Sequence, residues 1–66
     1  MARTVVSLRV EYIWEYRCFA VQAVYSNGMT RNLARANTEV GALAAMDGHG
    51  RRLGLTASAD RQTYSR

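Results

Sequence analysis

The sequence predicts an α+β fold, in which a three- to four-stranded antiparallel sheet (β-β-β-α-β) carries one helix on one face. Three observations predict it. Residues 4–16 alternate between apolar and polar types, Asn27-Gly28 follows a second apolar run, and Thr38 precedes an Ala-rich stretch. Alternation with period two is typical of a half-buried strand. Since 66 residues suffice for one domain only, we expect a single domain over 1–57 and a polar tail over 58–66.

The first strand is predicted by large apolar side chains at every second position. They are Val6, Leu8, Val10, Tyr12, Trp14 and Tyr16. The next bulky residues, Phe19 and Val21, are odd-numbered, so the alternation changes phase between Glu15 and Cys18. A turn or a bulge in this stretch would absorb the change.

Asn27-Gly28 predicts a hairpin between a second strand over 18–25 and a third over about 29–35. This dipeptide suits a type I′ turn, which needs positive φ at both central positions. Two registers remain open. A two-residue loop pairs Tyr25 with Thr30, whereas a three-residue loop with a bulge pairs Ala23 with Leu33. The second keeps the apolar face more uniform, and the sequence favours it for that reason.

A helix is predicted from Glu39 to Asp47, because Thr38 can cap it and the charge of Glu39 suits its first turn. Gly48 is placed to end the helix in a left-handed conformation. Residues 49–52 then form a loop, and residues 53–57 alternate well enough to add a short fourth strand. The remaining residues are polar and unpatterned, which is typical of a tail that is mobile or ordered by a partner.

Few residues are suited to catalysis or to metal binding. Cys18 is the only cysteine, and one Cys with one His (His49) cannot complete a structural zinc site. Nothing in the sequence places His49 beside Cys18 as a base. The stretch 47–52, with two glycines and two arginines, could cradle an anion, but the carboxyl end of the preceding helix faces it. We therefore expect no enzyme activity, no cofactor and no metal.

The charge balance suggests two kinds of partner. The chain has nine arginines, no lysine and a formal net charge of +4. Such a chain can bind nucleic acid by neutralising phosphates, or it can bind an acidic protein. A GC-rich coding sequence would produce the same arginine excess without functional meaning. With a lone cysteine, no signal-peptide pattern and no apolar run near the roughly 20 residues of a membrane span, the chain is expected to be cytoplasmic.

The aromatic residues of the first strand give the clearest functional indication. A helix of about ten residues covers only ~15 Å, whereas a strand of a dozen residues spans about 40 Å. The end that carries Trp14 and Tyr16 should therefore lie beyond the helix. Exposed aromatic surface of this kind is typical of a protein interface or a dimer contact.

The predicted partner-binding residues combine these aromatic residues with nearby arginines. Arg31 and Arg35 are four positions apart on one strand, so we expect them to share a face and to form a basic patch with Arg51 and Arg52. The full set is Tyr12, Trp14, Tyr16, Arg17, Arg31, Arg35, Arg51 and Arg52.

The sequence thus predicts a small non-enzymatic binding protein. We expect an inhibitor or regulator of the type encoded by phages and mobile elements, including anti-defence proteins, that docks on a protein or nucleoprotein complex. The alternative is a basic module that contacts nucleic-acid phosphates through arginine. Because so short a chain buries little surface, a homodimer is a further expectation.

Overall fold

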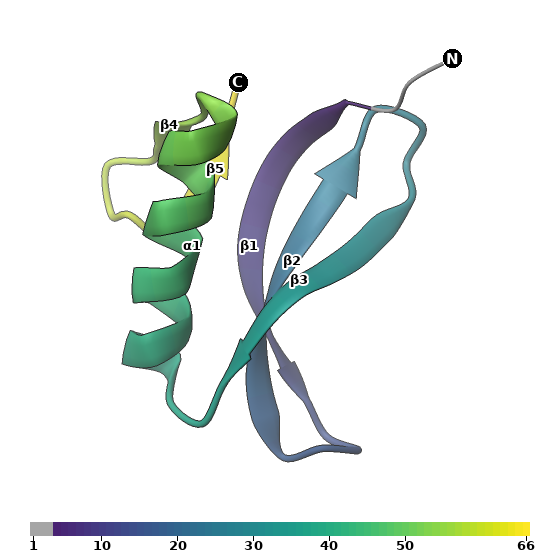
Figure 1. Ribbon diagram of the computed structural model, residues 1–66, viewed down its shortest axis with the longest axis vertical. Helices are drawn as coiled ribbons and strands as arrows, with labels where there is room; N and C mark the ends of the chain where they lie inside the picture. Colours follow the sequence, from purple (N-terminus) through teal and green to yellow (C-terminus); the bar gives the residue numbers. More distant parts are fainter. Residues whose placement is uncertain (1–3) are drawn as a thin grey trace.

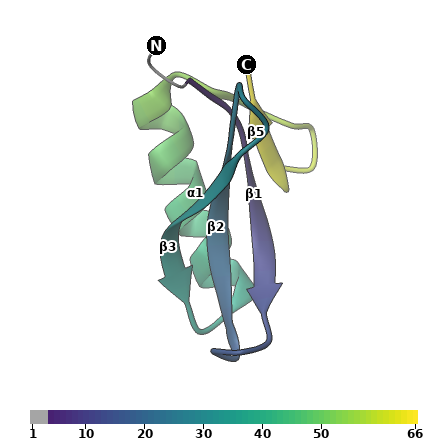
Figure 2. The same cartoon turned by 90° about the vertical axis from the view of Figure 1, so that its right-hand side faces the viewer.

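The computed structural model describes residues 4–66 and confirms the α+β class (Figure 1). Its elements are β1 (Val5–Ile13), β2 (Cys18–Tyr25), β3 (Thr30–Ala36), α1 (Glu39–Leu53), β4 (Thr56–Ala57) and β5 (Thr63–Ser65). The strands form one antiparallel sheet in the order β3-β2-β1-β5-β4. The sheet has five strands rather than three or four, and α1 covers one of its faces (Figure 2).

The first strand is shorter than the alternation of residues 4–16 predicts. β1 ends at Ile13, which pairs with Cys18, and residues 14–17 form the turn between β1 and β2. The expected change of phase between Glu15 and Cys18 is therefore a turn. The pattern overestimates the strand because two turn residues, Trp14 and Tyr16, happen to continue its spacing.

The hairpin between β2 and β3 is confirmed, but its turn is not type I′. The N–H of Gly28 donates to Tyr25 O at 2.9 Å, and the N–H of Tyr25 donates to Met29 O at 2.8 Å. Gly28 has a φ of +85°, whereas Asn27 does not have positive φ. Asn27 instead accepts a hydrogen bond from the Met29 N–H on its side-chain oxygen at 3.1 Å. The turn thus needs left-handed backbone at glycine alone.

Neither of the two expected registers of this hairpin is found next to its turn. Ala23 pairs with Arg31, and the register shifts by one residue between Gln22 and Val21, so that Val21 pairs with Ala34. The bulge lies within β3, at Leu33, and not at the turn. A bulge reverses which side chains face the helix, because the residues on either side of it differ in phase.

The helix begins as predicted and ends later. The Thr38 hydroxyl accepts the Gly41 N–H at 3.1 Å, as expected of an N-cap. The predicted stop at Gly48 is wrong, since α1 continues to Leu53 and Gly54 (φ +73°) terminates it. Residues 48–52 are therefore helical, and their backbone N–H groups bond within the helix instead of forming an anion nest.

The predicted C-terminal tail is also corrected by the structure. Thr63–Ser65 is strand β5, which lies between β1 and β4, and Tyr64 is buried. The Arg66 N–H donates to Val6 O at 3.2 Å, and its Nε donates to Val5 O at 2.8 Å. The predicted fourth strand over 53–57 shrinks to Thr56–Ala57, because Leu53 belongs to the helix.

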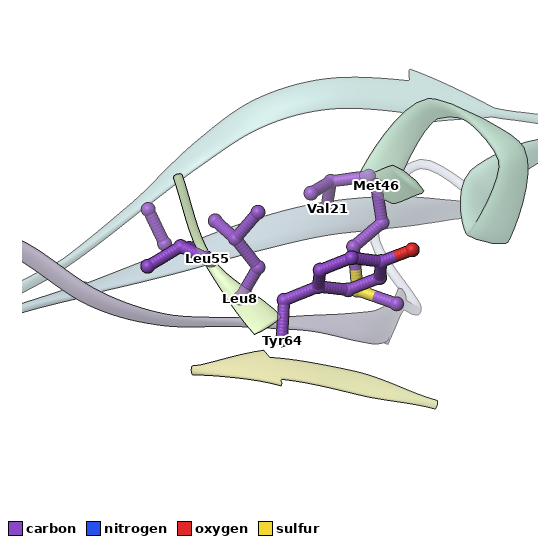
Figure 3. Packing of buried hydrophobic residues seen from close by; sticks show 6 residues of the cluster. Leu8, Val21, Met46, Leu55 and Tyr64 are labelled. Carbon is purple, nitrogen blue, oxygen red and sulfur yellow. The ribbon is translucent and has the colours of Figure 1, made fainter. Parts of the chain in front are cut away.

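The core lies between the sheet and α1. Its buried residues are Leu8, Val21, Ala23, Met46, Leu55 and Tyr64. Figure 3 shows the Tyr64 ring beside Met46, with Leu8 and Leu55 filling the space towards β4. Since Leu8, Val21 and Ala23 face α1, the residues that alternate with them lie on the outer face of the sheet.

Candidate docking surface

The turn between β1 and β2 projects beyond the first turn of α1 (Figure 1). The Tyr16 N–H donates to Ile13 O and the Arg17 N–H donates to Trp14 O, both at 3.3 Å. Arg17 closes the turn with a φ of +49°. Trp14 and Tyr16 are thus held on a short hydrogen-bonded turn at one end of the molecule. We call Tyr12, Trp14, Tyr16 and Phe19 the aromatic tip.

Three rings of the aromatic tip pack edge to face. The centroid of Tyr12 lies 5.0 Å from that of Trp14 and 5.1 Å from that of Phe19, with interplanar angles of 86° and 67°. Tyr12 pairs with Phe19 across β1 and β2, on the face that α1 covers further along the sheet. Trp14 is 79% exposed and Tyr12 is 40% exposed. These contacts orient the indole while leaving most of it open to solvent.

Tyr16 points to the other side of the hairpin. Its ring lies under the guanidinium of Arg35, whose Cζ is 4.6 Å from the ring centroid. Arg35 pairs with Ala20 on the outer face of the sheet, where Ala20 and Cys18 are both buried. Tyr16 is still 63% exposed. The aromatic tip therefore presents aromatic surface on both faces of the sheet.

The predicted basic patch is not formed as expected. Arg31 pairs with Ala23, which faces the helix, whereas Arg35 pairs with Ala20 on the outer face. The bulge at Leu33 separates the two arginines onto opposite faces, so their spacing of four does not place them together.

The other two predicted arginines lie in the last turn of α1. Arg51 pairs there with Asp47 at 3.1 Å, and Arg52 is exposed beside it. Cations at this end suit the helix macrodipole. Arg17, in contrast, belongs to the turn of the aromatic tip, so of the predicted arginines Arg17 and Arg35 are the two that the structure brings to the aromatic residues.

The outer face beside the aromatic tip is polar and partly self-compensating. Arg9 Nε lies 3.0 Å from Glu11 Oε1 and donates to Gln22 Oε1 at 2.9 Å. Glu15 lies in the turn itself. The surroundings of the aromatic tip therefore contain acids as well as arginines.

Elsewhere, one polar cluster joins α1 to β5. The Tyr64 hydroxyl donates to Asp47 Oδ1, and Arg51 pairs with the same carboxylate. The hydrogen bond from Tyr64 is the main reason that the pKa of Asp47 is below its ordinary value, and Arg51 and Arg61 lower it further. The same bond raises the pKa of Tyr64. This cluster holds the last strand to the helix.

We expect this cluster to limit stability at both ends of the pH range. Because the folded pKa of Asp47 is below its usual 3.8, its contribution is present above pH 3.8 and is lost as the pH falls through the folded pKa. Because the folded pKa of Tyr64 is above its usual 10.0, its contribution is present below pH 10.0 and is lost as the pH rises through the folded pKa. Thermal melts of Tyr64→Phe should lack the alkaline loss and show a smaller acid loss, because Arg51 and Arg61 still lower the pKa of Asp47 and Ser58 lowers that of Asp60. An unchanged pH profile would contradict this role.

The described residues offer no enclosed site for chemistry. They contain no pocket and no group of three side chains suited to holding a metal. Cys18 is buried on the outer face of the sheet, whereas His49 lies on α1, so the sheet separates the thiol from the imidazole. The aromatic tip offers exposed apolar surface to another molecule.

Sequence reasoning missed one feature of this surface. It did not foresee that β5 would leave part of β1 unpaired beside the aromatic tip, since a three-residue strand with one apolar residue has no recognisable pattern. Within residues 4–66, no helix is long and apolar enough to cross a membrane. Comparisons with models of protein families, with curated proteins and with solved structures find no match for this chain.

Proposed function

We propose that this protein is a small non-enzymatic binding protein, an inhibitor or regulator, that docks through its aromatic tip on a protein or nucleoprotein partner. The exposure of Trp14, at 79%, carries the proposal. Trp14 and Tyr16 stand on a hydrogen-bonded turn and do not belong to the buried core. The single thiol, Cys18, suits a reducing compartment, so we expect the function to be cytoplasmic.

The exposed aromatic surface can supply part of the affinity that this role needs. At 79% and 63% exposure, Trp14 and Tyr16 leave roughly 300 Å² uncovered, since an aromatic side chain carries about 200 Å². At about 25 cal/mol per Å², burying this area is worth roughly 7 kcal/mol before the cost of association. Trp, Tyr and Arg are also the residues that most often dominate the energy of an interface.

Direct nucleic-acid binding is the second candidate, favoured by the net charge of +4. Rings such as Trp14 could stack on bases, and arginines could neutralise phosphates. Glu11 and Glu15, however, lie beside the rings, and the arginines are distributed over both faces and both ends of the molecule. The charge distribution at the aromatic tip therefore favours a protein surface over a phosphate backbone.

Replacement of Trp14 by Ala should lower the affinity for the partner by about 30-fold, the equivalent of about 2 kcal/mol for a central interface residue. Its matched control is Val40→Ala, because Val40 is 77% exposed but lies on α1, outside the aromatic tip. Both variants and the parent chain are immobilised on a resin and incubated with nuclease-treated cell lysate. The proteins that each one retains are then quantified. A protein retained by the parent and by the Val40 variant but lost with Trp14→Ala supports the proposal.

Salt dependence separates the two candidates. Trp14 is the only tryptophan, so its fluorescence and its quenching by acrylamide report binding directly. Single-stranded and duplex oligonucleotides that shield Trp14, with an affinity that falls steeply as salt rises, would establish the second candidate instead. If nuclease removes every retained species, the protein-docking proposal fails.

A further inference from the structure

Strand β1 is paired along only part of the side that faces away from β2. Its partner there, β5, has three residues, which pair with Ser7, Leu8 and Arg9, whereas β1 continues to Ile13. Figure 2 shows β5 beside the upper part of β1 and no strand beside the lower part. We call residues 10–13 of β1 the open edge.

The backbone groups of the open edge that point away from β2 can be identified. The Arg66 N–H donates to Val6 O, and Leu8 pairs with Tyr64. The backbone N–H and C=O groups of the even-numbered residues of β1 therefore point away from β2. The alternation places the Val10 C=O and both backbone groups of Tyr12 on the same side. Past Arg9, none of residues 4–66 pairs with β1 there.

The open edge is less protected than the other strand edges of the sheet. β3 has a bulge at Leu33 and carries Arg31 and Arg35, features that discourage strand addition. β4 has only two residues. Residues 10–13 contain no bulge and no proline and carry one charged residue, Glu11. They include Tyr12 and adjoin Trp14.

The nature of an added strand follows from β5, which it would continue. In β5, Tyr64 faces the helix side with Leu8, and its neighbours face outward. A residue paired with Tyr12 would likewise face the rings of Tyr12 and Trp14, so an apolar side chain is favoured there. Glu11 of the open edge is paired with Arg9, whereas Arg17 at one end and Arg61 near the other make no ion pair within residues 4–66. Acidic residues therefore suit the flanks of an added segment and not its centre.

A second copy of the chain is a less suitable occupant. Each copy carries a net charge of +4, so bringing two copies together works against like charge, whereas an acidic segment is attracted. The proposed docking function requires a foreign partner in any case.

We propose that the open edge accepts an extended segment of a partner protein, apolar opposite Tyr12 and acidic at its flanks, as an added β-strand. The segment bonds to the Tyr12 backbone and the Val10 C=O, and an apolar side chain packs on Tyr12 and Trp14. This inference rests on the proposed docking function and specifies its mode. Main-chain bonds supply affinity in such complexes, and alternate side chains supply specificity.

Amide hydrogen exchange tests the edge itself. In the free protein the Tyr12 amide should exchange fast, and the Glu11 amide, which faces β2, should exchange slowly. A displayed library of random dodecapeptides, selected on the parent chain, supplies the probe. Binding of a selected peptide should slow exchange at Tyr12 at least tenfold and leave Glu11 unchanged.

Peptide chemistry gives the second readout. Methylating alternate backbone nitrogens of a selected peptide should weaken binding at least tenfold at bonding positions and little at the positions between them, since each lost bond costs about 1.4 kcal/mol. Selected peptides should be acidic at their flanks, and Arg17→Glu should weaken their binding.

The outcomes separate this inference from the docking function. Peptides that need Trp14 but tolerate every N-methyl group, with Tyr12 exchange unchanged, would overturn strand addition and leave docking intact. If Tyr12 becomes protected merely on concentrating the protein, a second copy occupies the edge and the proposal is wrong. If selection yields no peptide that depends on Trp14, strand addition is overturned, and the docking function stands or falls with the Trp14→Ala retention experiment.

Discussion

A chain that ends at Gln62 is expected to lose its cooperative unfolding transition. Removing Thr63–Arg66 takes away β5 and the buried Tyr64, and it leaves β4 without a pairing strand. A domain of this size has a total stability of only about 3 to 10 kcal/mol. The free energy lost with one interior strand and one buried aromatic side chain is comparable with that total stability. The shortened chain should therefore be largely unfolded.

Near-ultraviolet circular dichroism and a thermal melt measure this loss. Ser65→Ala is the matched control, because Ser65 is exposed and its backbone pairing does not depend on its side chain. The control should melt within a few degrees of the parent. A shortened chain that melts cooperatively at the parent temperature would show that the last strand adds nothing to the fold.

The elements that could be predicted from the sequence are those with local signals. Asn27-Gly28 specifies a hairpin through backbone that glycine adopts easily, and Thr38 specifies a helix start through a hydrogen bond three residues away. Both signals act over a few residues. Their outcome does not depend on the rest of the fold.

The elements that could not be predicted depend on long-range packing. Tyr64 is a single apolar residue in a polar stretch, and its place in the core is set by Leu8, far away in the sequence. The bulge at Leu33 separates Arg31 from Arg35, and no local feature of the sequence predicts it. Arg51, Arg52 and Gly54 did carry the signal for the true helix end, through charge and a left-handed cap.

The exposure of the aromatic tip was predicted for a reason that is only partly correct. Trp14 and Tyr16 lie beyond the helix as expected, but they stand on a turn and not on an overlong strand. This difference matters for the proposed docking, because a turn presents the two rings on opposite faces, whereas a strand would have placed both on one face. The shortness of β5 leaves the neighbouring residues of β1 as the open edge.

The two glycines near the end of α1 are expected to respond to alanine in opposite directions. A Cβ at Gly48 meets nothing within 4 Å, so Gly48→Ala should stabilise the fold by about 0.5 to 1 kcal/mol, through the better helix propensity of alanine. A Cβ at Gly50 would lie 2.9 Å from Cγ of Tyr64, closer than carbon atoms approach. Overpacking of this kind costs about 1 to 3 kcal/mol.

In thermal melts, the Tm of Gly48→Ala should lie several degrees above that of the parent, and the Tm of Gly50→Ala several degrees or more below it. A change of about 1 kcal/mol shifts Tm by roughly 4 to 8 °C in a domain of this size. The double variant Gly50→Ala, Tyr64→Leu should lose less than the sum of its single changes, because the smaller side chain relieves the clash. If both glycine variants melt above the parent, α1 does not approach β5 as closely as described. Glycine at position 50 is then not required for the helix to lie on Tyr64, and the contact that keeps the last strand in the sheet must come from elsewhere.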